Sequence, residues 1–440
     1  MEESSYRQAY GDLKRHQRLL AGASEKERNR MLQAVALKLE TSQGEIRASN
    51  EQDIESAHAD RVAEPLIRRL VLDEHKLAAV CAGVRQVARL PDPIGAVRER
   101  RLLDDNLLLE RVSVPIGVIG MIFESRPDAL IQIISLALKS GNAIVLKGGH
   151  EALNTNRTLV ELVRRALEPF EAGSGWIVHL EQREDVKTLL ELDTVVDLLI
   201  PRGSNAFVRY VMDHTRIPVL GHADGICAMY IDEFAEPDLA VNVALDSKCQ
   251  YPAACNAVET VLVHRGVAET FLPRFEQALK PYGVTIHGDP ATAEIIACVP
   301  ASEDAWSTEY LDYELAVKIV ASMDEAIEHI GRCGSGHTDA IVTEDEARAR
   351  TFLAAVDSAD VFWNASTRFA DGFRFGLGAE VGISTGKIHA RGPVGLDGLV
   401  TDKWILKGSG QVVAAYESGQ ALFKHRTLPP GGSSILSGDA

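Results

Sequence analysis

Two series of alternating strand-like and helix-like segments constrain the fold of this chain more than any other feature. The first series begins at Val114 and the second begins after Asp232. Their strand-like segments, such as "NAIVLKG" and "VETVLVH", are short, apolar and rich in β-branched residues. Near-continuous apolar strands are typical of parallel sheets that helices cover on both faces. The sequence therefore predicts an α/β protein with two α/β domains joined near residues 220–235.

The segments outside these series predict helices and a β-hairpin. Residues 4–92 carry apolar residues at three- and four-residue spacing, which is typical of amphipathic helices. In residues 98–117, Asp104-Asp105-Asn106 separates two leucine-rich arms, as in a hairpin turn. So small a ribbon has little core of its own, so we expect it to contact another copy of the chain.

The C-terminal region adds little globular structure. The stretch "LVTDKWILKGSG" can supply one more extended segment. Residues beyond Leu428 are rich in Pro, Gly and Ser, and we expect a flexible tail there.

The charge balance limits the classes of partner. The formal net charge of −17 argues against nucleic acid and against an anionic membrane surface, since both need a basic face. No apolar run approaches the length needed to span a bilayer, and the charged N-terminus lacks the apolar core of a signal peptide. We expect a cytoplasmic protein in which any anionic ligand is held by locally placed cations or backbone N–H groups.

The six cysteines are sparse and irregularly spaced, which is typical of reduced thiols in a cytosolic protein. Cys249 and Cys255 lie six residues apart, with no second pair to complete a zinc site. The sequence therefore predicts no metal.

Cys255 stands out among these cysteines because of its position. It lies in the turn "YPAACNA", directly ahead of the apolar strand-like run Val258–Val263. A thiol at the mouth of a strand in an α/β protein can be a nucleophile, yet a cysteine is also a small hydrophobe that often only fills a core. The spacing alone leaves both interpretations open.

Two turns between strand and helix in the first series have the composition of nucleotide-binding loops. One is "LKGGHE", with Lys147, Gly148, Gly149 and His150, and the other is "PRGSN", with Arg202, Gly203 and Ser204. Glycines allow a phosphate to approach the backbone where a helix begins, and the cations complement its charge. Such turns also occur as plain connections, and no G-x-G-x-x-G fingerprint is present.

At this point a family resemblance adds to the residue-level interpretation. From about residue 5 to residue 425 the chain resembles gamma-glutamyl phosphate reductase, of the aldehyde dehydrogenase superfamily, and is most similar to the reductase half of pyrroline-carboxylate synthases. The stretches that carry the resemblance are "VPIGVIGMIFESRPD", "LIPRGSN", "GHADGICAMYID", "KCQYPAACNAVETVLVH", "STEYLDYELAV", "SGHTDAIVTED", "VFWNASTRFADGFRFGLGAEVGISTGKIHARGPVGL" and "TDKW".

The resemblance implies an aldehyde dehydrogenase-like fold with a Rossmann-like cofactor domain, an α/β catalytic domain and a small β ribbon. Its expected boundaries are 1–97 with 115–225 for the NADPH-binding domain, 226–395 for the catalytic domain, 98–114 with 396–425 for the oligomerisation segment, and 426–440 for the tail. The implied reaction reduces L-glutamate 5-phosphate to L-glutamate 5-semialdehyde with NADPH and releases phosphate, on the route to proline.

For catalysis, the resemblance implies that Cys255 is the nucleophile that forms a thioester, with Cys249 as its rival. Asn256 and the neighbouring alanines leave room for the tetrahedral intermediate, and the backbone N–H of Cys255 is a candidate oxyanion donor. The place of the superfamily's oxyanion asparagine falls at Ser125, whose hydroxyl can donate instead.

In aldehyde-oxidising members of the superfamily, a glutamate activates water. The resemblance implies that Gly221 occupies the matching position in this chain, although Asp224 is close in sequence. Loss of that base favours an acyl-phosphate reductase over the alternative, a hydrolytic semialdehyde dehydrogenase. A non-catalytic scaffold that partners a kinase is a third interpretation.

For the cofactor, the resemblance implies contacts from Lys147, Gly149, His150, Arg202, Gly203, Ser204 and Glu314. His150 stands where NAD-preferring members often carry an acid, and an acid would repel a 2′-phosphate. We therefore expect NADPH, although Glu151 is adjacent.

For the substrate, the anionic groups need specific cations in so acidic a protein. The candidates are Arg126 and Arg391, each of which can equally be a structural ion pair, with Glu124 for the ammonium group and Asn364 as a polar contact. His222 and His389 are treated as structural. Because no glutamate kinase domain is present, a transient complex with glutamate kinase is a further hypothesis.

Overall fold

The structure is a computed structural model that describes residues 3–124, 126–182, 184–222 and 224–430. It forms two compact units. Unit 1 comprises the described residues of Met1–Gly203, Tyr210–Leu220 and Gly395–Ala440, and unit 2 comprises those of Ser204–Arg209 and Gly221–Val394.

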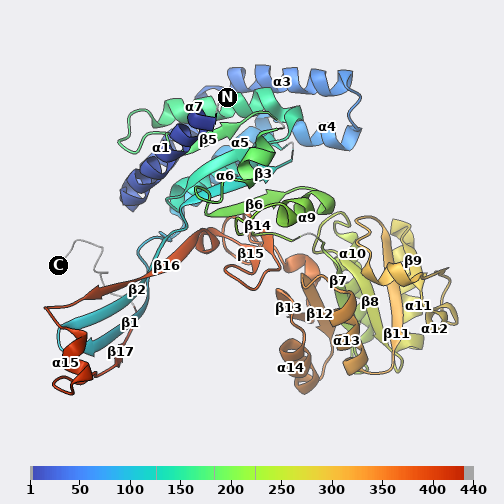
Figure 1. The fold of residues 1–440 in the computed structure, drawn as a ribbon. Coiled ribbons are helices and arrows are strands. Elements are labelled where there is room, and N and C mark those ends of the chain that lie inside the picture. Colours follow the sequence, from blue (N-terminus) through green and yellow to red (C-terminus); the bar gives the residue numbers. More distant parts are fainter. Residues whose placement is uncertain (1–2, 125, 183, 223, 431–440) are drawn as a thin grey trace. The chain divides into compact units, whose positions relative to one another are not determined.

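Unit 1 contains the helical N-terminal region and a parallel sheet. The predicted helical stretch forms five helices: α1 (Glu3–Gly22), α2 (Glu25–Thr41), α3 (Gln43–Ala59), α4 (Glu64–Leu70) and α5 (Glu74–Arg89). The sheet has the order β5-β4-β3-β6 (Figure 1). Its strands and helices are β3 (Val118–Phe123), α6 (Pro127–Lys139), β4 (Ala143–Lys147), α7 (Leu153–Leu167), β5 (Ile177–Leu180), α8 (Asp185–Leu190) and β6 (Leu198–Arg202), and α9 (Asn205–Asp213) follows β6.

The order of this sheet determines where a ligand can bind. The chain runs from β3 outward to β4 and β5, and then returns to pair β6 with the other side of β3. The direction of progression therefore reverses between β3 and β6. In open parallel sheets, ligands bind outside the carboxyl ends of the strands at such a reversal.

A four-stranded antiparallel ribbon completes unit 1, and the predicted hairpin forms its centre. β1 (Val97–Asp104) and β2 (Leu107–Pro115) pair across a turn in which Asn106 has a φ of 57°. The C-terminal segment adds β16 (Val400–Lys407) beside β2 and β17 (Arg426–Leu428) beside β1, with α15 (Val413–Glu417) between them. The extended segment predicted from "LVTDKWILKGSG" is thus an edge strand of the ribbon.

Unit 2 is built on seven parallel strands in the order β10-β9-β11-β8-β7-β12-β13 (Figure 1). The strands are β7 (Cys227–Ile231), β8 (Val258–His264), β9 (Thr285–Gly288), β10 (Val299–Pro300), β11 (Glu314–Val320), β12 (Thr338–Val342) and β13 (Asp360–Trp363), with the short pair β14 (Gly382–Ser384) and β15 (Gly392–Val394) after them. The helices are α10 (Pro237–Cys249), α11 (Ala268–Leu279), α12 (Pro290–Ala293), α13 (Met323–Cys333) and α14 (Glu346–Ala355).

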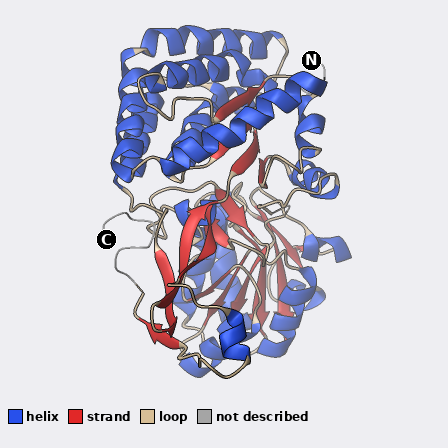
Figure 2. Cartoon of the chain, turned by 60° about the vertical axis from the view of Figure 1, so that its left-hand side comes forward, coloured by secondary structure: helices blue, strands red, loops and turns tan. Residues whose placement is uncertain are grey.

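Helices cover both faces of this sheet, as the continuous apolar strands predict (Figure 2). On β8, Val261 and Val263 pack with α10 and α11 on one face. Leu262 points to the other face and packs with α13 and α14. Both faces of β8 are therefore core, because successive side chains of a strand alternate.

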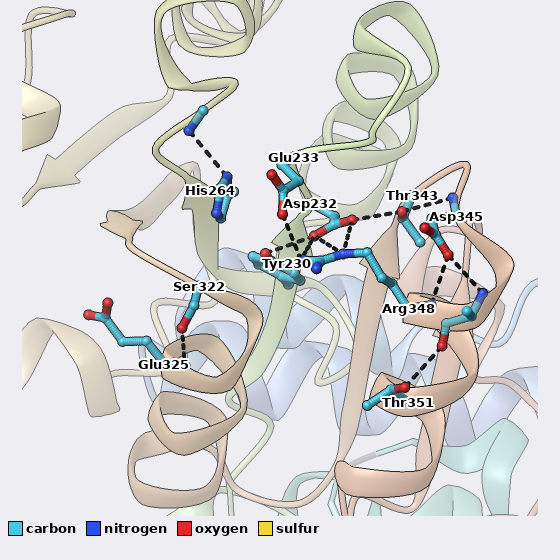
Figure 3. Close-up of polar contacts among 12 residues, drawn as sticks. Tyr230, Asp232, Glu233, His264, Ser322, Glu325, Thr343, Asp345, Arg348 and Thr351 are labelled. Atoms are coloured by element: carbon cyan, nitrogen blue, oxygen red, sulfur yellow. Dashed lines mark hydrogen bonds and ion pairs between the residues drawn. The ribbon is translucent and has the colours of Figure 1, made fainter.

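A buried ionic network ties the carboxyl ends of β7 and β12 to α14 (Figure 3). Asp232 is fully buried and accepts from Arg348 Nη2 at 2.6 Å, from Arg348 Nε at 2.8 Å and from the Thr343 hydroxyl at 2.8 Å. The Tyr230 hydroxyl donates to it at 2.9 Å. Burial alone would raise the pKa of Asp232, but these donors hold it below its usual value.

Removing the cation should destabilise unit 2 strongly. We expect Arg348→Ala to lower the free energy of unfolding by about 3 kcal/mol, because it leaves the Asp232 charge buried without a cation. Arg350→Ala is the matched control, since Arg350 lies on the same helix and pairs only with the exposed Glu346. Its expected cost is below about 0.5 kcal/mol. Urea unfolding of the three proteins measures both values, and equal costs would contradict this account of the network.

Candidate functional site

Cys255 lies in a tight turn between α10 and the amino end of β8. The turn is closed by the Ala257 N–H, which donates to the Ala254 carbonyl at 2.9 Å. Next to the thiol, the buried Asn256 donates from Nδ2 to the Ala370 carbonyl at 2.7 Å. Asn256 therefore anchors the turn, while the Cys255 side chain remains half-buried.

Two histidines lie beside Cys255. One nitrogen of His222, one nitrogen of His337 and the Cys255 sulfur all lie within 4.8 Å of one another. The two rings meet edge to face, with their centroids 4.7 Å apart. Our sequence analysis treated His222 as structural and missed His337. The fold thus assembles a Cys–His–His cluster from residues far apart in the chain, in a place where sequence spacing had predicted no metal-ligating set.

Sheet pairing is the physical reason for this cluster. His222 precedes β7, Cys255 precedes β8 and His337 precedes β12, and these three strands are neighbours (Figure 1). Parallel neighbours bring their amino ends to the same edge. The signal available in the sequence was a Gly-His pair shortly ahead of a strand, which occurs in both "GHADGICAMYI" and "SGHTDAIV".

The hydrogen bonds of the two rings orient their remaining nitrogens. His222 Nδ1 lies 2.9 Å from the Ile383 carbonyl, so it must donate. His337 Nδ1 lies 2.8 Å from the Thr338 hydroxyl, which itself hydrogen-bonds the Asp360 carboxyl group. His337 is fully buried, and its Nε2 has no hydrogen-bond partner among the described residues. Burial, reinforced by His222, holds the pKa of His337 well below its usual value, so this ring is neutral.

Gly225 packs against both the backbone of Cys255 and the side chain of Glu309, and sequence analysis missed Gly225 and Glu309. A Cβ atom on Gly225 would lie 2.2 Å from the Cys255 carbonyl oxygen, 2.7 Å from its Cα and 2.5 Å from Glu309 Oε1. The side chain of Asn205 donates to the Glu309 carboxylate. Gly225 is thus required by close approach, and the motif "ADGIC" carried that signal.

Arg368 is a cation near Cys255 that sequence analysis also missed. Its side chain is 8% exposed, donates from Nε to Gln250 Oε1 at 3.0 Å and lies over the Tyr251 ring at 5.9 Å. Burial lowers its pKa, while the Cys255 charge acts in the opposite direction. Among the residues that the structure describes, no carboxylate forms an ion pair with it. Arg368 is thus a desolvated cation beside the thiol.

The structure gives the sequence-derived substrate candidates other contacts. Arg391 donates to Asp357 Oδ1 at 3.0 Å, and Arg126 donates to Asp128 at 2.9 Å. Glu124 pairs with Arg69 at 3.2 Å.

Two further candidates from the sequence lie elsewhere in unit 2 or outside the description. Asn364 lies at the carboxyl end of β13, where its Nδ2 donates to the Thr343 carbonyl at 3.0 Å. It is therefore at the opposite edge of the sheet from Cys255. Ser125, the oxyanion candidate, lies outside the described residues.

Residue 221, the position expected for a water-activating base, carries no carboxylate. Gly221 has no side chain, and the neighbouring Asp224 pairs with Arg209. The Asp224 carboxylate is therefore engaged by Arg209. This agrees with the sequence-based argument against a hydrolytic enzyme.

The cofactor candidates of unit 1 lie at the carboxyl edge of its sheet. Lys147 ends β4, and Gly149 and His150 follow it. Arg202 ends β6 beside the reversal of strand order, and Gly203 follows it. Lys147 is buried, and its Nζ donates to the Gly148 carbonyl at 2.6 Å. Burial lowers its pKa, and no carboxylate forms an ion pair with it within the described part of the chain. A cation in this position fits a dinucleotide.

The two remaining cofactor candidates belong to unit 2. Ser204 directly precedes α9. Glu314 begins β11, and its Oε2 lies 2.8 Å from His287 Nε2. Both remain predictions as cofactor contacts.

Comparison with known proteins now decides the family. The family model "Aldehyde dehydrogenase family" matches residues 2–295. This chain belongs to the aldehyde dehydrogenase family. A Cyanothece gamma-glutamyl phosphate reductase is 55% identical over 410 residues, which are 93% of this chain and 95% of that protein. A Ruminiclostridium cellulolyticum protein of the same name is 52% identical over 93% of this chain and 95% of its own.

A solved structure agrees with both the family and the fold. The gamma-glutamyl phosphate reductase of Thermotoga maritima is 40% identical, covers 92% of this chain and 99% of its own, and superposes with a TM-score of 0.90. The predicted family and the predicted aldehyde dehydrogenase-like α/β fold are therefore confirmed, and the chain is an oxidoreductase of the gamma-glutamyl phosphate reductase branch. Two solved structures that share the fold, an engineered glycolyl-CoA reductase and a glyceraldehyde-3-phosphate dehydrogenase from Methanocaldococcus jannaschii, hold NADP⁺ and NADP. None of the described helices is long and apolar enough to cross a bilayer.

The packing of Gly225 yields a direct test of the Cys255 turn. We expect Gly225→Ala to reduce oxidoreductase turnover by at least about tenfold, because the new methyl displaces the Cys255 backbone and misplaced reacting groups lose rate steeply. The matched control is Gly331→Ala on α13, where an added Cβ meets no heavy atom within 4 Å. Steady-state kinetics, with circular dichroism to verify folding, measure the outcome. Full turnover in Gly225→Ala would contradict the requirement for close approach.

Proposed function

We propose that this enzyme reduces L-glutamate 5-phosphate to L-glutamate 5-semialdehyde with NADPH and releases phosphate, a step of proline biosynthesis. The observation that carries the proposal is the half-buried Cys255 thiol between two imidazoles, in a chain that is 50–55% identical over about nine-tenths of its length to proteins named gamma-glutamyl phosphate reductase.

The first step forms a thioester on Cys255. His222 is the proton acceptor that the geometry favours, because its Nδ1 donates to the Ile383 carbonyl and leaves the lone pair on Nε2, whereas His337 is buried and neutral. The sulfur attacks the γ-carbonyl carbon, the bond from that carbon to the phosphate oxygen breaks, and phosphate leaves with that bond's electron pair. The backbone N–H of Cys255 stabilises the oxyanion, a role that Ser125 can share.

The second step turns the thioester into the aldehyde. NADPH supplies the hydride when it is bound. Once the thioester carbon had gained a hydride, the hemithioacetal anion on Cys255 would collapse to the semialdehyde as the carbon–sulfur bond breaks. The Cys255 thiolate would then take back the proton that His222 accepted in the first step. No described carboxylate in the "GHADG" stretch is available to activate water, because Asp224 is paired with Arg209, so the thioester is protected from hydrolysis.

We assign the cofactor to Lys147, Gly149, His150, Arg202 and Gly203 at the carboxyl edge of the unit 1 sheet. Ser204 and Glu314 remain separate predictions as cofactor contacts. His150 leaves room for a 2′-phosphate where an acid would repel it. Lys147 adds a buried positive charge at the same edge.

We assign the acyl phosphate to Arg368. The protein has a net charge of −17, so an anionic substrate needs a locally unpaired cation, and Arg368 has that character beside the thiol. Arg391, Arg126 and Glu124 remain predictions for the other groups of the substrate. Asn364 is not assigned to the substrate, because it lies at the edge of the unit 2 sheet opposite Cys255.

We also propose that the enzyme is a cytoplasmic homo-oligomer. None of its six cysteines is in a disulfide, which fits a reducing compartment. The edge strand β16 exposes Trp404 and Leu406 by 53% and 55%, and such an edge favours pairing with a second copy. A transient complex with glutamate kinase, which would deliver the labile acyl phosphate, remains a hypothesis.

The thioester can be trapped in the reverse reaction. Semialdehyde and NADP⁺ without phosphate should load an acyl group onto Cys255, because the acceptor that releases it is missing. We expect mass spectrometry to find the adduct in the wild type and in Cys249→Ala, and not in Cys255→Ala. Adding phosphate should discharge it as acyl phosphate. An adduct on another residue, or rapid formation of glutamate without phosphate, would overturn the proposal in favour of the hydrolytic alternative.

The two arginine candidates can be separated by kinetics. We expect Arg368→Met to raise the KM for phosphate in the reverse reaction by about tenfold or more, because a hydrogen bond to a charged group contributes about 1.5–3 kcal/mol. Arg350→Met is the control for a lost surface charge. If Arg391→Met instead raises that KM and Arg368→Met does not, the phosphate belongs to Arg391.

A further inference from the structure

We propose that His222, Cys255 and His337 form a reversible binding site for Zn²⁺ or a similar borderline-soft divalent ion. Three donor atoms from three separate turns lie within 4.8 Å of one another in unit 2. Some point therefore lies within about 2.8 Å of all three atoms, and typical Zn–N and Zn–S distances are about 2.0–2.3 Å. Side-chain movements of less than about 1 Å therefore complete the coordination.

The tautomers of both rings favour coordination. Nδ1 of His222 donates to the Ile383 carbonyl, so its Nε2 carries the lone pair. Nδ1 of His337 faces a hydroxyl that is already engaged with Asp360, which gives this ring the same tautomer. Metal-binding histidines usually donate their other ring N–H to such a partner, because this fixes the orientation of the ring.

His337 supplies the independent sign of a missing ligand. It is fully buried, yet its Nε2 has no hydrogen-bond partner among the described residues. A buried polar atom without a partner is costly, and a metal ion at the centre of the cluster would satisfy it.

The donor set selects the class of metal. Two imidazole nitrogens and one thiolate are typical ligands of zinc, whereas Mg²⁺ and Ca²⁺ prefer oxygen. Three protein ligands leave one position for water. The nearby Arg368 cation opposes a second positive charge, so we expect weaker binding than at a closed structural zinc site.

Metal binding and turnover would compete for one sulfur. On binding, the Cys255 thiol releases its proton to solvent and the sulfur bonds to the metal, so it cannot attack an acyl carbon. This inhibitory consequence rests on the proposed function, but the binding itself does not. The site would therefore make the reductase sensitive to available zinc.

The test uses the full-length enzyme after chelator treatment and dialysis. With Co²⁺ as the probe, we expect a thiolate-to-cobalt charge-transfer absorption that Zn²⁺ abolishes by displacement, and calorimetry with Zn²⁺ should give one site per chain. Cys255→Ser should lose the absorption, and His222→Gln should weaken Zn²⁺ binding at least about tenfold. His337→Gln should do the same, and because it alters a buried residue, its folding is checked by circular dichroism.

Matched controls identify the ligands. Cys249→Ser changes a buried thiol that does not belong to the cluster, and His287→Gln changes a ring that is bonded to Glu314, so both should keep wild-type Zn²⁺ affinity. Unchanged affinity in Cys255→Ser or His222→Gln, or no Co²⁺ spectrum in the wild type, would overturn the proposal. If the wild type gives the Co²⁺ spectrum but no trapped thioester, the metal site stands and the proposed function is refuted. If it gives the trapped thioester but no Co²⁺ spectrum, the metal site alone is refuted.

Discussion

Parallel pairing of β8, β7 and β12 is the constraint on which the candidate site depends. Because the three strands run in the same direction, the turns that precede them meet at one edge of the sheet. Those turns carry Cys255, His222 and His337. Open α/β sheets commonly bind ligands at the carboxyl edge, where unit 1 has its reversal of strand order, whereas unit 2 collects its reactive groups at the amino edge. Its carboxyl edge instead holds the Asp232–Arg348 network (Figure 3).

Burial decides the charge states around the thiol. His337 is kept neutral by desolvation, and Arg368 keeps a charge without a paired carboxylate in the described structure. His337 therefore offers a lone pair, and Arg368 supplies a positive electrostatic potential. Without such a cation, the net negative charge of the protein would repel an anionic substrate. The imidazole lone pairs suit both a thiol that must lose a proton and a metal ion that would block it.

Much of the fold could be predicted because its signals are local. Apolar runs at strand length predicted the sheets, and Asp104-Asp105-Asn106 predicted the hairpin that the structure contains. The position of Cys255 ahead of β8 was also visible. Local sequence patterns could not predict the neighbours of Cys255, because Glu309, His337 and Arg368 are separated from it by 54, 82 and 113 positions in the chain. Their proximity depends on strand order, which hydrophobic periodicity does not specify.

The sequence by itself determined the α/β class, the ribbon, the family and the turn that presents Cys255, because each follows from a contiguous pattern. Only the tertiary structure decided which side chains surround that sulfur. In that structure Arg391 pairs with Asp357, Asn364 lies at the edge of the sheet opposite Cys255, and two histidines lie next to the thiol. The physical reason is that a side chain's partners are fixed by the order in which strands pair, and that order is settled by the packing of the whole unit.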